Sequence, residues 1–139
     1  MASSSLLCIY DASFAAGLLE AMTQVVVEQK AVLLLAYDTG YPEPLHSVRP
    51  VPDTFAVGLV LAPHRTGRSL AQWSLDPANC FSHAAADRLQ DAALEQVRQT
   101  IPAARSLPLL CSVATQSTDT VVLAYLDELQ LAVQVLPCR

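Results

Sequence analysis

Residues 6–37 decide the fold class, and they read LLCIYDASFAAGLLEAMTQVVVEQKAVLLLAY. The apolar run Leu6–Tyr10 has the length of a strand, and Ala12–Glu28 carries apolar residues at the three- and four-residue steps of a helix. Ala31–Tyr37 is a second apolar run, and its lack of alternation predicts a strand buried on both faces. A strand, a helix and a strand in quick succession predict a βαβ unit with parallel strands and a right-handed crossover.

The two ends of the predicted helix carry recognisable capping residues. Asp11 or Ser13 is a suitable N-cap, because a short polar side chain can accept from the free backbone N–H groups there. Gln29-Lys30 closes the helix. Gly17 costs about 1 kcal/mol of helix propensity relative to alanine, so we expect Ala16 and Gly17 to pack closely against another backbone.

The remainder of the chain predicts further helices and strands in one domain, residues 1–139. Asp38–Asp53 contains Gly40 and four prolines and is therefore predicted to be a long, extended loop. The elements expected after it are strands at Thr54–Ala62 and Leu70–Leu75, helices at Ala84–Thr100 and Leu107–Ala114, and a C-terminal β-hairpin of Asp119–Leu126 and Leu129–Leu136 around Asp127-Glu128. The predicted fold class is α/β with a mixed sheet.

Composition and charge exclude several classes of partner. Hydrophobic residues make up 53% of the chain and charged residues 15%, with a net charge of −5. A nucleic-acid or anionic-membrane binder needs a basic surface, so neither partner is expected. The apolar runs are too short to span a membrane, and the first residues lack the features of a signal peptide. The sequence therefore predicts a cytoplasmic protein.

Four cysteines are scattered along the chain, at Cys8, Cys80, Cys111 and Cys138. They form no CxxC pair and have no histidine at ligand spacing, which argues against zinc, and a cytoplasmic location argues against disulfides. We expect all four to be small core residues and expect neither a metal nor a cofactor.

The turn between the first predicted strand and helix is the candidate functional site. Exposed N–H groups and the helix dipole favour negative charge there, which suits a nucleophile or an oxyanion site. This position holds Asp11, for which an N-capping role is the alternative. Ser13, His46 and Asp38 could form a Ser-His-Asp set, but a Gly-x-Ser-x-Gly elbow is missing. Solvated loop positions, rather than catalytic ones, are predicted for all three histidines, His46, His64 and His83.

Four segments of the sequence together resemble the β-ketoacyl synthase-like family. They are Asp11–Ala21, Val32–Asp38, Pro42–Pro44 and Phe55–Ala62. More narrowly, the pattern resembles the divergent, chain-length-factor-like branch of aryl-polyene and type II polyketide clusters. The resemblance covers about Leu6–Ala62 and implies a thiolase-like half-domain. It also implies that the chain is the C-terminal portion of such a subunit, as a truncated form, a late start or a natural short form.

The resemblance implies an accessory rather than a catalytic subunit. Active members carry a cysteine nucleophile at the position of Asp11, and Cys8 lies three residues too early. A carboxylate cannot form the acyl thioester that a thiolate forms. The family's catalytic histidine pair, one of them in a His-Gly-Thr-Gly-Thr motif, has no counterpart in this sequence. The implied role is pairing with an active synthase, or with itself as a dimer, through Leu6–Tyr10 and Asp38–Asp53.

Two other functions and two weaker surface features remain open at this point. The chain could be a small acyl hydrolase or transferase using Cys8 or Asp11, or a structural oligomerisation module. Arg98 and Arg105 could contact an acidic carrier protein, with solvated helix charge as the alternative. Trp73 could form a patch with the Arg65/Arg68 turn, with half-buried packing as the alternative.

Overall fold

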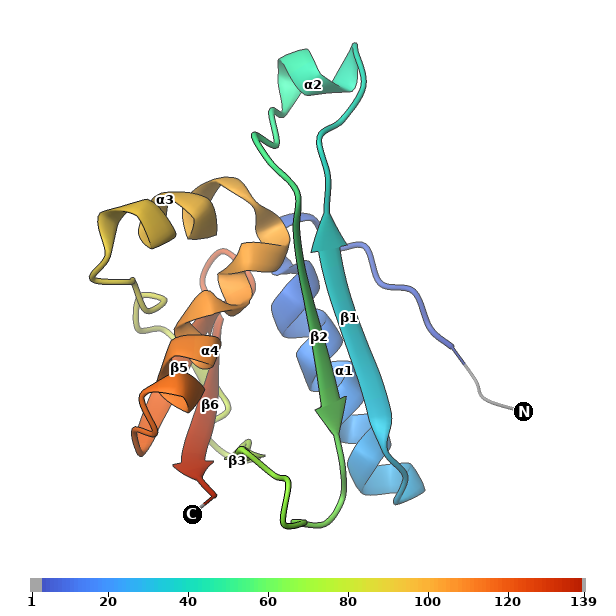
Figure 1. The fold of residues 1–139 in the computed structure, drawn as a ribbon, viewed down its shortest axis with the longest axis vertical. Coiled ribbons are helices and arrows are strands. Elements are labelled where there is room, and N and C mark those ends of the chain that lie inside the picture. The colour runs from blue at the N-terminus through green and yellow to red at the C-terminus, as the bar shows by residue number, and fades with distance from the viewer. Residues whose placement is uncertain (1–3, 139) are drawn as a thin grey trace.

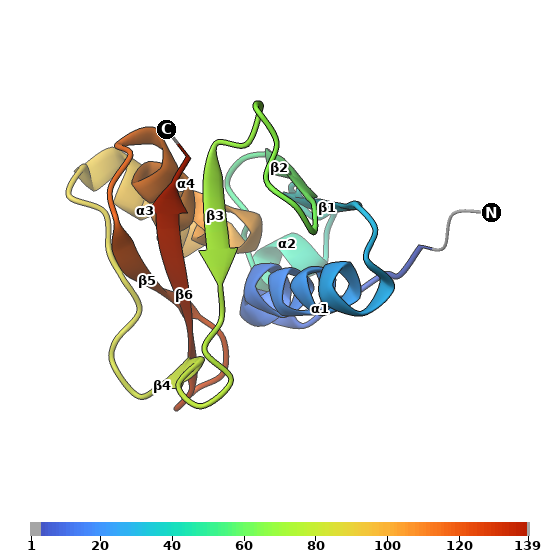
Figure 2. The same ribbon diagram turned by 90° about the horizontal axis from the view of Figure 1, so that it is seen from below.

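In the computed structural model, which describes residues 4–138, one long helix packs against a two-stranded ribbon, and the two together face a four-stranded antiparallel sheet (Figures 1 and 2). The helix is α1, Ser13–Glu28, and a short 3-10 turn, η1 (Tyr10–Ala12), precedes it. One face of α1 packs against the two-stranded ribbon of β1 (Val32–Asp38) and β2 (Phe55–Leu61). The helix and the ribbon both contribute side chains to the core that they share with the four-stranded sheet.

The ribbon is fully paired along its length. Val32 lies opposite Leu61 at one end of the register, and Asp38 lies opposite Phe55 at the other. The connection between the strands extends beyond the ribbon and carries the single-turn helix α2, Leu45–Val48. It brings Arg49 back toward the beginning of α1, where the candidate site lies.

The second sheet is built around the last strand, β6 (Gln130–Pro137). The strands β3 (Ala71–Ser74) and β4 (Phe81–Ser82) pair with one edge of β6, and β5 (Asp119–Ala124) pairs with it as a hairpin. Between β4 and β5 the chain forms α3 (Ala92–Thr100), the 3-10 helix η2 (Pro102–Ser106) and α4 (Leu107–Ala114).

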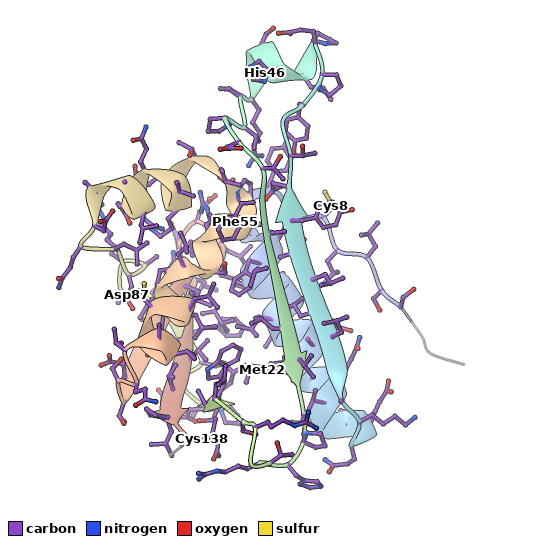
Figure 3. All side chains as sticks on the ribbon, viewed as in Figure 1. Cys8, Met22, His46, Phe55, Asp87 and Cys138 are labelled. Atoms are coloured by element: carbon purple, nitrogen blue, oxygen red, sulfur yellow. The ribbon has the colours of Figure 1, made fainter. Side chains whose placement is uncertain are left out.

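The main core lies where α1 meets both sheets and α4. Its fully buried members come from α1, α4, β5 and β6, and they are Phe14, Ala15, Leu18, Leu109, Val121, Leu123, Leu131, Val133 and Val135. A smaller cluster of Val51, Ile101 and Ala104 joins the long loop to η2, and Phe55 packs against it (Figure 3). This second cluster places η2 beside the beginning of α1.

The α/β fold class and the C-terminal hairpin are confirmed, whereas the βαβ unit is wrong. Residues 6–9 form no strand, because no neighbouring strand within residues 4–138 is placed to pair with their backbone groups. The two strands that follow α1 pair with each other instead, and every strand pairing among the described residues is antiparallel. The strand β1 is also not buried on both faces, since its residues alternate between half-buried and exposed.

Two predicted helix boundaries are wrong for reasons visible in the hydrogen bonds. Residues 84–91 run beside β5, where Asp87 and Val122 exchange two hydrogen bonds, and α3 begins only after the N-cap Asp91. At α1, neither Asp11 nor Ser13 caps the helix, because the N-cap residue is Ala12, which makes no side-chain capping hydrogen bond. The hydroxyl of Ser13 accepts from the N–H of Ile9 at 2.9 Å and donates to the carbonyl of Tyr10 at 2.7 Å. The end of α1 at Gln29 is confirmed.

Two packing predictions are corrected. None of the four cysteines is buried, because Cys8 is exposed and the other three are half-buried. Gly17 does pack closely, but against a side chain rather than a backbone. A Cβ atom on residue 17 would lie 3.1 Å from Cδ1 of Leu34 in β1.

Candidate functional site

Three segments that are distant in the sequence meet at Asp11. This residue lies in η1, immediately before α1, and its carboxylate is half-exposed. One oxygen accepts from Nη2 of Arg49, at the end of the loop between β1 and β2. The other lies 3.0 Å from Nη2 of Arg105 in η2. Both carboxylate oxygens of Asp11 are therefore engaged by guanidinium groups.

The neighbouring contacts hold these groups in place. The guanidinium carbon of Arg49 lies 4.4 Å from the centroid of the Tyr10 ring, which is a cation–π contact. Tyr10 has a φ of 50°, a left-handed conformation that is uncommon for a residue with a bulky side chain. The Nε atom of Arg105 is buried and has no hydrogen-bond partner among residues 4–138. Asp11 thus forms the ion pair of a guanidinium group whose Nε atom has no hydrogen-bond partner in the described part of the chain.

An open groove of about 610 Å³ lies beside Asp11. One wall is the segment that leads into α1, residues 9–12, and the other is the β5–β6 turn, residues 125–129, together with His83. Nδ1 of His83 lies 2.8 Å from the carbonyl oxygen of Glu128, and Tyr125 stacks on Phe81 with ring centroids 5.8 Å apart. His83 is exposed, as predicted, but its place in the wall of this groove depends on tertiary contacts that the sequence pattern does not reveal.

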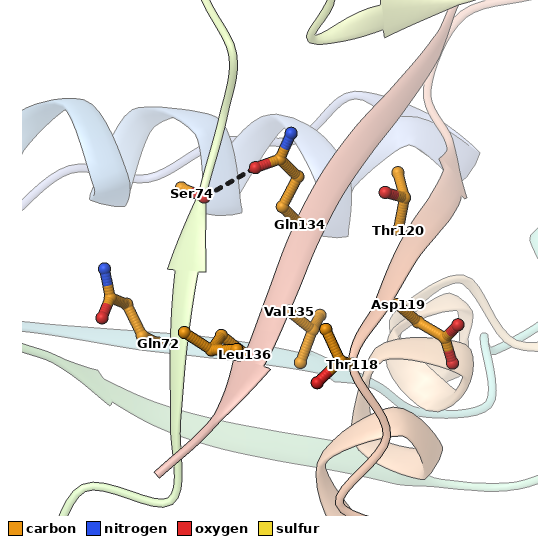
Figure 4. Close-up of a pocket in the computed structure, with 8 residues that line it drawn as sticks. All are labelled: Gln72, Ser74, Thr118, Asp119, Thr120, Gln134, Val135 and Leu136. Carbon is orange, nitrogen blue, oxygen red and sulfur yellow. Dashed lines mark hydrogen bonds between the residues drawn. The ribbon is translucent and has the colours of Figure 1, made fainter.

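A second hollow of about 430 Å³ lies over the four-stranded sheet (Figure 4). Most of its lining residues are of polar types and come from β3, β6 and the beginning of β5, and the hydroxyl of Ser74 donates to Oε1 of Gln134 at 3.2 Å. Polar residues are ordinary on the solvent-facing side of an antiparallel sheet. We therefore assign no chemistry to this hollow.

The structure does not assemble the Ser-His-Asp set. The hydroxyl of Ser13 is bonded to the backbone of residues 9 and 10, as described above. Oδ2 of Asp38 accepts from the N–H of Ala103 at 2.5 Å. His46 lies on α2, at the far end of the loop (Figure 3). Cys8 is exposed on the segment before η1 and does not line the groove beside Asp11.

The two arginines considered for a carrier protein are already paired. Arg98 is buried and makes two hydrogen bonds to the carboxylate of Glu95, at 2.6 and 2.7 Å. These bonds, with the N–H of Leu89, hold the pKa of Glu95 well below its usual range. Arg105 pairs with Asp11. Solvated helix charge is therefore the wrong description of both side chains.

Trp73 is half-buried and packs against the main core, which confirms the packing interpretation. Among residues 4–138, no group of three or more His, Cys, Asp or Glu side chains is arranged to hold a metal ion. No helix in this part of the chain is long and apolar enough to cross a membrane.

The α/β architecture, with helices and two antiparallel sheets, is consistent with a thiolase-like half-domain. The chain belongs to the β-ketoacyl synthase family, because the family model described as beta-ketoacyl synthase, N-terminal domain, matches residues 1–125. This match corrects the expectation that the chain is the C-terminal portion of a subunit. Searches of curated proteins and of solved structures found no match.

Proposed function

We propose that this chain is a non-catalytic, accessory β-ketoacyl synthase-like subunit. In this role it pairs with an active synthase in the cytoplasm and helps to shape the cavity for a growing acyl chain, as a chain-length factor does. The aryl-polyene and related type II polyketide systems are the setting that the sequence resemblance favours. Asp11 then occupies the position of the nucleophilic cysteine.

The observation that carries this proposal is the double ion pair of Asp11. A nucleophile must have a free electron pair directed at the substrate, and a base that activates it must lie within hydrogen-bond reach. Both oxygens of Asp11 are directed at Arg49 and Arg105 instead. A carboxylate in this position supports the fold at the beginning of α1 and does not supply the thiolate that condensation requires.

Two further observations favour pairing over a stand-alone function. The segment before η1 is apolar and exposed, with Leu6 91% and Leu7 42% accessible. The groove beside Asp11 is open to solvent, so a second subunit that closed it would complete an enclosed cavity. A small hydrolase using Cys8 has less support, because that thiol lies outside the groove.

Co-expression with an active synthase of an aryl-polyene-type system tests the proposal. We expect the two proteins to co-purify, and we expect the products to differ in chain length from those of the synthase alone. Given acyl and malonyl carrier-protein substrates, the chain by itself should show no condensation or decarboxylation. Turnover by the chain alone that disappears on changing Asp11 or Cys8 would overturn the proposal in favour of an enzyme.

A further inference from the structure

The two ends of the β1–β2 ribbon carry opposite charges. Lys30 precedes β1, and Arg65 and Arg68 lie in the turn that follows β2. The antiparallel register places all three at the same end of the ribbon, the lower end in Figure 1, and we call them the basic end. Asp38 and Asp53 lie at the opposite end, about 20 Å away by the length of a seven-residue strand.

The charge of the basic end is opposite to that of the whole chain. The net charge is −5, yet residues 29–37 and 54–75, which form this end and the strands that lead to it, contain no Asp or Glu. All three cationic side chains are exposed, and neither Lys30 nor Arg68 forms an ion pair within the described residues. Glu28, at the end of α1, is the acid closest to Lys30 in the sequence. Because salt screens charges beyond about 10 Å, the distant acids do not cancel this local positive charge.

Exposed aliphatic side chains accompany these cations. Leu70 directly follows the basic turn and is 74% exposed, and Val26 and Val27 in the last turn of α1 are 68% and 75% exposed. Figure 2 looks onto this end of the molecule from below. Aliphatic side chains beside cations are the composition of protein surfaces that lie in a lipid–water interface.

The turn after β2 is held by hydrogen bonds within itself. The N–H of Ser69 donates to the carbonyl of Thr66 at 3.1 Å, and the N–H of Thr66 donates to Oγ of Ser69 at 2.9 Å. The carbonyl oxygen of Leu70, the next residue, accepts from the N–H of Cys138 at 3.0 Å. The backbone therefore presents the cations and Leu70 together, and binding needs little further ordering of this segment.

We propose that the basic end docks on an anionic lipid surface. The ammonium and guanidinium groups then lie at the level of the lipid phosphates, and Leu70, Val26 and Val27 enter the boundary with the acyl chains. An acidic protein surface would also pair with the cations, but it offers no apolar layer beneath its charges for these aliphatic side chains. The sequence-based expectation of no membrane contact rested on net charge, which does not show that the charges are segregated.

The lipid-docking surface is separate from the site at Asp11. Asp11 precedes the first turn of α1 and Lys30 follows its last, so about 24 Å of helix lies between them. A chain bound through its basic end leaves Asp11 and the groove beside it accessible to a partner subunit. The inference therefore goes beyond the accessory role and does not depend on it.

Co-sedimentation of the full chain with lipid vesicles tests this inference. We expect binding to phosphatidylcholine vesicles that contain phosphatidylglycerol, weakening as salt is added, and little binding to phosphatidylcholine alone. Each cation near an anionic leaflet strengthens binding about fivefold, so the double variant Lys30→Glu/Arg68→Glu should bind about tenfold more weakly or worse. Leu70→Ser should also weaken binding, at low and at high salt. Arg88→Glu is the matched control, because Arg88 is an exposed arginine outside the basic end. Circular dichroism should show that each variant is folded.

The outcomes separate lipid docking from other uses of this end. No sedimentation with the anionic vesicles, or equal sedimentation with uncharged ones, would refute the inference. Binding that Arg88→Glu weakens as much as the double variant does would show unspecific attraction and would also refute it. Binding to soluble polyglutamate that depends on Lys30 and Arg68, without binding to vesicles, would assign the basic end to an acidic protein partner instead.

Discussion

Nη2 of Arg105 lies 3.0 Å from Oδ2 of Asp11, and this ion pair joins η2 to the turn that begins α1. The contact is not local, because residues 11 and 105 lie in the first and last thirds of the chain. Arg49 approaches the same carboxylate from the loop between β1 and β2. The side chain of Asp11 thus connects three parts of the domain.

Asp11→Asn should destabilise the domain. The change removes the charge that two guanidinium groups share, and part-exposed pairs of this kind contribute up to about 1 kcal/mol each. We expect a loss of about 1–2 kcal/mol in the free energy of unfolding, measured by urea denaturation. Asp53→Asn is the control, because Asp53 is exposed and accepts only from the adjacent N–H of Thr54 in the contacts described. Equal stability of the two variants would show that the Asp11 pairs contribute nothing.

Gly17→Leu should destabilise the contact between α1 and β1. The added Cβ alone would lie 3.1 Å from Cδ1 of Leu34, and the rest of the leucine side chain must displace it further. Overpacking of this kind typically costs about 1–3 kcal/mol. Thermal unfolding measures the effect, with Val27→Leu as a control on the exposed side of the same helix. An unchanged melting temperature would contradict the packing described for Gly17.

Stability should fall in acid partly through Glu95. Its pKa is lowered in the folded state, chiefly by hydrogen bonds from Arg98 and then from the N–H of Leu89, relative to an ordinary value of 4.5. A lowered pKa stabilises the fold above the unfolded-state value, and this contribution is lost as the pH falls below 4.5. The free energy of unfolding, measured by denaturation at pH values above and below 4.5, should therefore fall less steeply in acid for Glu95→Gln than for the native chain. The control variant is Glu28→Gln, at an exposed residue, and its stability should depend on pH as that of the native chain does.

Cys8 should react with a thiol reagent before the other cysteines do. It is exposed, whereas Cys80, Cys111 and Cys138 are half-buried. In the folded chain we expect one fast and three slower thiols in a colorimetric titration, and Cys8→Ser should remove the fast phase. Equal reaction rates for all four thiols, or a fast phase that remains in Cys8→Ser, would show that the segment before η1 is not exposed as described.

Local patterns in the sequence determined the elements whose contacts are also local. The helical spacing over residues 12–28, the β-hairpin around Asp127-Glu128 and the helix Leu107–Ala114 all follow from short-range periodicity and turn residues. The identity of residue 11 as an acid, and hence the absence of a thiol there, is likewise a property of the sequence alone. These features require no knowledge of what lies across the core.

Tertiary structure alone decided how those elements pair and which side chains meet. An apolar run has the same sequence whether its strand is parallel or antiparallel, so the antiparallel pairing of β1 with β2 could not be distinguished from a βαβ unit. The partners of Asp11 are Arg49 and Arg105, and no local sequence pattern indicates that either residue lies near Asp11. Burial also depends on what covers a face, and for this reason the cysteines and the outer face of β1 are more exposed than their apolar sequence predicts.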